Sequence, residues 1–133
     1  MLLPGLVAAA SALSQAPNVD EIVLQGRYLE VPRPTAGADA HARAVWAFAR
    51  YHLACDREVA AAASSAHEAG EVLGSYVLLE CLRHGDGIRR DPARLAKLNH
   101  ALHQRLSAKE KLTAFELLTL AATTPAKDRK SVV

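Results

Sequence analysis

The stretch HGDGIRRDPARL, residues 84–95, decides how the fold of this chain is interpreted. Gly85 suits the left-handed position just beyond a helix end, and Gly87 suits a reversal of the chain. Asp91 followed by Pro92 is a favoured pair of N-cap and first helical residue. The stretch therefore predicts a turn between two helices, with Gly85, Gly87, Asp91 and Pro92 as its structural residues.

The same glycines raise the alternative of a phosphate-binding loop. Such loops usually follow a strand and place glycine-rich backbone at the start of a helix. Here the preceding residues have a helical pattern, Asp86 and Asp91 add negative charge, and no Gly-Lys-Ser/Thr follows. These features favour the structural turn.

Hydrophobic spacing on both sides of the turn predicts an all-α protein of five to six helices. Of the 133 residues, 50% are hydrophobic and only 5% are aromatic, which favours helix over strand. Residues 71–84 are apolar on nearly every side, which is typical of a helix buried between others. The helix after Pro92 carries a stripe of leucines, Leu95, Leu98, Leu102 and Leu106. The expected helix starts are near residues 19, 40, 57, 71, 92 and 109.

Capping residues indicate where these helices begin and end. The predicted helix starts are Asn18 with Glu21, Asp39, Asp56, and Ser107 with Glu110. The predicted helix ends are Gly26, about Cys55 for the helix that Asp39 begins, Gly70 and Pro125. The alanines of the helix after Asp56 form a close-packing face, because small side chains let a neighbouring helix approach. A β-hairpin about Gly26 is the less favoured alternative for residues 21–31.

Composition shifts divide the chain into four segments. They are 1–16, an apolar N-terminal helix or signal-like segment; 17–38, a helix and a Pro/Gly linker; 39–124, a helical-repeat domain; and 125–133, a polar tail. The first segment lacks the basic start of a secretory signal and is too short to span a bilayer. We therefore expect a retained helix and a cytoplasmic protein, with a secreted or periplasmic protein as the alternative if residues 1–16 are cleaved.

From Gly70 to Leu102 the chain resembles a Sel-one-like repeat, a relative of the tetratricopeptide repeat. The positions that match the family pattern are Gly70, Gly74, Leu78, Leu82, Gly85, Gly87, Ile88, Asp91, Leu95, Leu98 and Leu102. The turn GDGIRRD is the most specific part of the match. Gly74 stands where the family has alanine, Leu79 replaces its inner glycine, and Leu82 and Leu98 replace aromatic residues. The resemblance covers about a quarter of the chain.

The resemblance implies a short right-handed α-solenoid of two to three stacked helical hairpins that contacts other proteins and is not an enzyme. The partner is then another protein or a second copy of the chain. The residues expected to bind it are the basic Arg89, Arg90, Arg94 and Lys97, suited to an acidic segment, and the apolar Leu117 and Leu120 of the last helix. The alanine face is a further candidate contact. A net charge of +2 argues against a nucleic-acid partner.

Two alternatives stay open at this point. His100 and His103 share a helix face at a spacing that can hold a metal, which leaves a metal-binding or small-molecule-binding helical domain possible. Cys55 and Cys81 lack CxxC spacing, so two buried thiols are favoured over a single bridge in an oxidising compartment. No motif predicts a cofactor, and the neighbouring Cys81 and His84 lack a nucleophile elbow.

Overall fold

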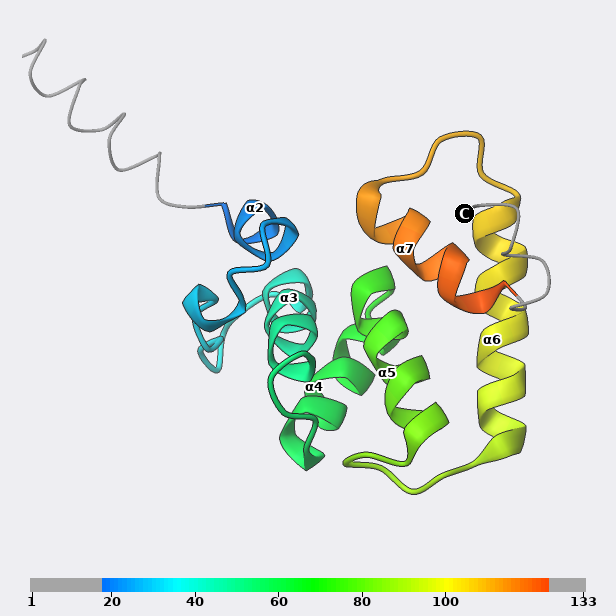
Figure 1. Ribbon diagram of the computed structural model, residues 1–133, viewed down its shortest axis with the longest axis horizontal. Coiled ribbons are helices and arrows are strands. Elements are labelled where there is room, and N and C mark those ends of the chain that lie inside the picture. Colours follow the sequence, from blue (N-terminus) through cyan, green and yellow to red (C-terminus); the bar gives the residue numbers. More distant parts are fainter. Residues whose placement is uncertain (1–17, 125–133) are drawn as a thin grey trace, which may run out of the picture.

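The computed structural model describes residues 18–124, and these residues form six α-helices, one short 3₁₀ helix and no strand (Figure 1). The elements are α2 (Val19–Leu24), η1 (Tyr28–Glu30), α3 (Ala40–Tyr51), α4 (Arg57–Glu68), α5 (Val72–His84), α6 (Pro92–Ser107) and α7 (Ala114–Thr123). The all-α prediction is confirmed. The predictions for residues 1–16 and for the tail 125–133 lie outside the described residues.

Helix α5 is the centre of the molecule, as its all-round apolar pattern predicts. It packs against α3 and α4 on one side and against α6 and α7 on the other (Figure 1). Its fully buried side chains include Leu73, Val77, Leu78, Leu79 and Leu82. This packing of successive helices is compatible with a short solenoid or with a small helical bundle.

The alanine face of α4 is used inside the molecule. Ala60, Ala63 and Ala66 are buried, and a Cβ atom placed on Gly74 of α5 would lie only 2.5 Å from the Cβ atom of Ala66. The small side chains therefore allow α4 and α5 to approach closely. The expectation of a close-packing face is confirmed, and the helix that these alanines approach is α5 of the same chain.

The predicted turn of residues 85–91 has the expected geometry. Gly85 has φ of 73° and donates its N–H to the carbonyl of Cys81 at 2.8 Å, which closes α5. Gly87 has φ of 68°, and a Cβ atom there would lie 2.2 Å from the carbonyl oxygen of Asp56. Asp91 accepts the N–H of Arg94 at 3.1 Å and so caps α6, with Pro92 in its first turn. The turn thus reverses the chain and rests on the start of α4.

Two predicted helix boundaries are wrong. Helix α3 ends at Tyr51 rather than near Cys55, since the N–H groups of Leu53 and Ala54 both turn back to the carbonyl of Arg50. A short connection then leads to the cap at Asp56.

The last helix begins at Ala114 rather than near residue 109. The capping box consists of Thr113 and Glu116, whose reciprocal bonds measure 2.9 and 3.2 Å, and not of Ser107 and Glu110. Ser107 is the last residue of α6, because the leucine stripe carries that helix through the buried Leu106.

Between residues 18 and 124, no helix has both the length and the apolar character needed to cross a membrane.

Candidate docking surface

Exposed apolar side chains identify a candidate docking surface, which we define as Tyr28, Leu29, Trp46, Arg50 and Leu53. Leu29 is 85% exposed and Leu53 is 47% exposed. Both line two adjoining hollows together with Tyr28, one of about 230 Å³ that extends to Gly26 and one of about 50 Å³ floored by Trp46. Large apolar side chains grouped at a hollow differ from the scattered exposed leucines of an ordinary surface.

The local fold explains why Leu29 points away from the core. Gly26, with φ of 77°, follows α2 and turns the chain into η1. The ring of Tyr28 then stacks on His52 with centroids 4.4 Å apart and meets Phe48 edge-on at 6.2 Å. Because Tyr28 fixes η1 against α3 on one side, its neighbour Leu29 is left on the solvent side.

Arginines surround this surface, and most of their charges are paired. Arg27 forms an ion pair with Glu30, which lowers the pKa of that carboxyl group through a hydrogen bond. Arg33 pairs with Glu58, and its guanidinium carbon lies 4.9 Å from the centre of the Trp46 ring.

Arg50 differs from these two. Its Nε atom is buried without a hydrogen-bond partner among the described residues, and its guanidinium carbon lies 6.0 Å from the Trp46 ring centre. The docking surface therefore combines apolar side chains with a half-buried arginine that forms no ion pair within residues 18–124.

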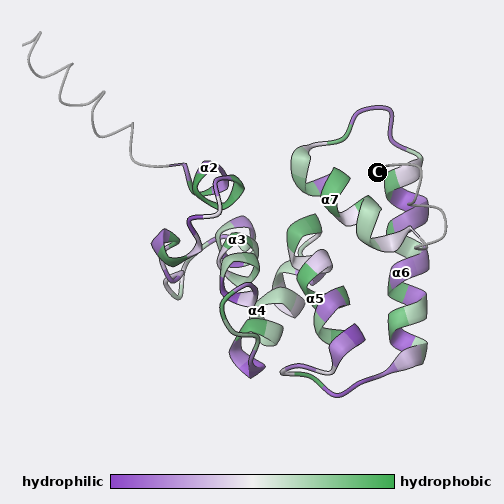
Figure 2. Ribbon diagram, viewed as in Figure 1, coloured by the Kyte–Doolittle hydropathy of each residue, from purple (hydrophilic) through white to green (hydrophobic). Residues whose placement is uncertain are grey.

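The basic residues predicted to bind a partner lie elsewhere. Arg89 and Arg90 are on the connection between α5 and α6, and Arg94 and Lys97 are in the first turns of α6. All four are exposed, and none forms an ion pair within residues 18–124. Figure 2 shows this connection as largely hydrophilic and well separated from η1. The structure therefore does not join these residues to the docking surface.

The two leucines predicted on the last helix have different environments. Leu117 is 55% exposed, whereas Leu120 is partly covered. Leu117 thus stands on α7 as a single exposed leucine.

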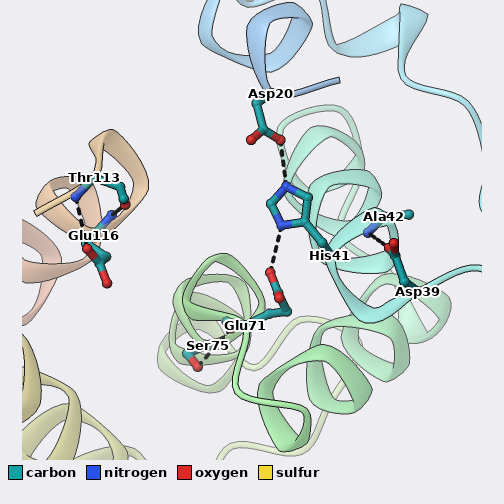
Figure 3. Close-up of polar contacts among 8 residues, drawn as sticks. All are labelled: Asp20, Asp39, His41, Ala42, Glu71, Ser75, Thr113 and Glu116. Carbon is teal, nitrogen blue, oxygen red and sulfur yellow. Dashed lines mark hydrogen bonds and ion pairs between the residues drawn. The ribbon is translucent and has the colours of Figure 1, made fainter. Parts of the chain in front are cut away.

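His41 forms a polar junction between three helices (Figure 3). Its Nε2 atom lies 2.7 Å from Asp20 of α2, and its Nδ1 atom lies 2.7 Å from Glu71, the N-cap of α5. Burial opposes the charged ring, but the hydrogen bonds to Glu71 and Asp20 prevail and raise the pKa of His41. The two carboxylates face opposite nitrogens, so this arrangement is an electrostatic link between helices.

The histidines considered as metal ligands are not gathered into a site. His103 contacts the hydroxyl of Thr123 at 3.0 Å, while His100 is exposed. Within the described part of the chain, no three His, Cys, Asp or Glu side chains are grouped so that they could hold a metal ion.

Sequence reasoning missed Leu29, Leu53 and Arg50 as members of one surface. The predicted helix stop at Gly26 leaves Leu29 without an assigned position, and the predicted helix to about Cys55 includes Leu53. The available signal was the sequence QGRYL at 25–29, in which a leucine follows closely after a helix-stopping glycine. A large apolar side chain in such a turn often stays exposed to solvent.

Comparison with known proteins identifies no relative: no family model, no curated protein and no solved structure matches this chain.

Proposed function

We propose that this protein is a non-catalytic scaffold or adaptor that binds another protein through the docking surface. The observation that carries the proposal is the grouping of Leu29 and Leu53 at two adjoining hollows, one of them lined by Trp46, on an otherwise well-packed helical frame. Binding energy at protein interfaces is concentrated in a few side chains, most often Trp, Tyr and Arg, and Tyr28, Trp46 and Arg50 are of these types.

The charges at this surface indicate the chemistry of the partner. Arg50 lines the same hollow as Leu53 and forms no ion pair within residues 18–124, whereas Glu30 and Glu58 are paired with arginines of the same chain. A second copy would bring its own Arg50 to the same place, and like charges oppose each other at an interface. We therefore expect a segment with a large apolar side chain for the hollow and a nearby Asp or Glu for Arg50.

We also propose that α5 and α6 form a Sel-one-like hairpin. Gly85 and Gly87 both adopt positive φ, Asp91 caps α6, and Pro92 is the first residue of that helix. These are the places that the family pattern gives to those residues. Such a hairpin supports a role in protein contact.

The test is selection from a displayed random peptide library on the full chain and, in parallel, on its Leu29→Glu variant. The wild-type protein should enrich peptides with a Leu, Ile, Phe or Trp close to an Asp or Glu. The variant should lose at least about tenfold in affinity for them, because a charge would occupy the apolar contact. Arg50→Ala should weaken binding of the acidic peptides in particular.

Leu117→Glu is the matched control, since it makes the same chemical change on α7 at a similarly exposed leucine. It should leave the selected peptides bound as tightly as the wild type. Three results would overturn the proposal: no enrichment, enrichment that Leu29→Glu does not reduce, or binding abolished by Leu117→Glu alone. Concentration-dependent self-association that Leu29→Glu abolishes would instead assign the surface to a second copy.

A further inference from the structure

Two free thiols meet where the connection between α3 and α4 crosses α5. The sulfur atoms of Cys55, on the connection, and Cys81, on α5, lie 3.0 Å apart. Cys81 is fully buried, whereas Cys55 is only partly buried. A disulfide bond measures about 2.05 Å, so a small movement of the connection brings the two sulfurs to bonding distance.

We propose that Cys55 and Cys81 form a reversible disulfide, made by exchange with a small-molecule disulfide, that fastens the α3–α4 connection to α5. The disulfide would form whether or not the docking surface binds a partner.

The chemistry proceeds in two exchanges. The Cys55 thiol loses its proton, and its sulfur attacks one sulfur of the small disulfide, which releases one small thiolate and leaves a mixed disulfide on Cys55. The Cys81 thiol then loses its proton and attacks the Cys55 sulfur, which releases the second small thiolate. In total, two protein thiols are oxidised to one disulfide, and one small disulfide is reduced to two thiols.

The surroundings decide the order of these steps. Cys55 is the more accessible sulfur and is therefore the one that meets the small disulfide. Cys81 has no exposed surface, so its reaction partner is the sulfur already beside it. Burial raises the pKa of both thiols, which keeps the thiolate fraction small at neutral pH. The exchange should accordingly be slow and should accelerate as the pH rises.

The bond would have a clear structural consequence. The two cysteines are 26 residues apart in the chain, and the loop between them contains all of α4. A covalent link across this loop restricts the unfolded chain and stabilises the folded one. It would also hold the connection that carries Leu53, two residues before Cys55, in its present place.

The test treats the reduced full chain with oxidised glutathione and follows its intact mass without reductant. The wild type should lose the mass of two hydrogens and retain no glutathione, and a thiol reductant should reverse the change. Tryptic peptides of the oxidised protein should include one that joins Cys55 to Cys81. The melting temperature should rise by several degrees on oxidation.

Two variants separate the steps. Cys81→Ser should accumulate a stable glutathione adduct on Cys55, because the second exchange cannot occur. Cys55→Ser should react far more slowly, because the remaining thiol is buried. Three results would overturn the proposal. The wild type could keep one or two glutathione adducts, or it could form only disulfide-linked dimers. It could also stay reduced under conditions in which Cys55 of the Cys81→Ser variant has already reacted with glutathione. The wild-type mass and peptide map decide the question even if a variant fails to fold.

Discussion

Helices α3, α4 and α5 share one continuous core, whereas the hairpin of α6 and α7 is attached to α5 by a narrower contact. Six consecutive residues of α3, Ala44–Ala49, are buried, but α6 buries only Leu102 and Leu106 of its sixteen. Two of the three buried residues of α7 are threonines, whose hydroxyls donate to carbonyls of their own helix. Burial, and with it stability, is therefore concentrated on one side of α5, so the hairpin on its other side should open more easily.

The largest expected effect comes from Leu78→Ala, at the centre of the core. Leu78 is fully buried on α5, so its truncation removes apolar burial and leaves a cavity. We expect the free energy of unfolding to fall by about 3–5 kcal/mol. Denaturant unfolding followed by circular dichroism measures this loss. The exposed Leu24 is the control: Leu24→Ala should change stability by less than about 0.5 kcal/mol, and equal effects of the two variants would contradict the assignment of the core.

Leu106→Ala makes the same change in the hairpin. Leu106 is also fully buried, but it lies on α6, outside the core cluster that contains Leu78, so we expect the helices around it to close part of the gap. We expect a loss of about 2 kcal/mol, at the lower end for such a truncation. Amide hydrogen exchange should become faster throughout α6 and α7 while α3, α4 and α5 stay protected. Equal loss of protection in all five helices would show that the two regions form one cooperative unit.

Gly87→Ala tests the point where the turn of the hairpin rests on the start of α4. An alanine here would need positive φ and would place its Cβ atom 2.2 Å from the carbonyl of Asp56. We expect the free energy of unfolding to fall by about 2 kcal/mol, because backbone strain and a steric clash add together. Gly26→Ala is the matched control, since Gly26 also has positive φ but has open space around it. Gly26→Ala should lower the free energy of unfolding by about 1 kcal/mol. If the two variants lost the same free energy of unfolding, the turn would be able to move away from α4.

The sequence correctly predicted the starts of three helices, the buried central helix and the turn that follows it. Asp39, Asp56 and Asp91 cap helices because a short carboxylate satisfies free N–H groups wherever a helix begins, which is a local rule. The burial of residues 71–84 follows from their composition, and so does the Gly85–Gly87 turn.

The errors occur where local signals compete. Two Ser/Thr-x-x-Glu patterns stand near the start of α7, and the first of them is not used because α6 continues through the buried Leu106 to Ser107. The docking surface depends on contacts between η1 and α3, such as Tyr28 on His52, which no sequence period reveals. The site was therefore harder to predict than the fold.

The smallest expected effect is a pH dependence at His41, which joins α2 to the core side. The pKa of His41 is raised in the folded protein, so its stabilising contribution is complete below the unfolded pKa of about 6.5 and is lost as the pH rises through the folded pKa. The side chain is 41% exposed, so solvent screening should limit the contribution to less than about 1 kcal/mol.

The measurement is the difference in the free energy of unfolding between the wild type and His41→Gln, at about pH 6 and about pH 9. The pKa of His67 is lowered by burial and responds to pH in the opposite sense, but His67 is present in both proteins and its effect cancels in the difference. The free energy of unfolding of the wild type should exceed that of His41→Gln at the lower pH, where the charged imidazole ring pairs with Asp20 on one side and Glu71 on the other. A difference in the free energy of unfolding that is constant or grows with pH would mean that His41 joins the helices as a neutral hydrogen-bonding group. The attachment of α2 would then not depend on charge.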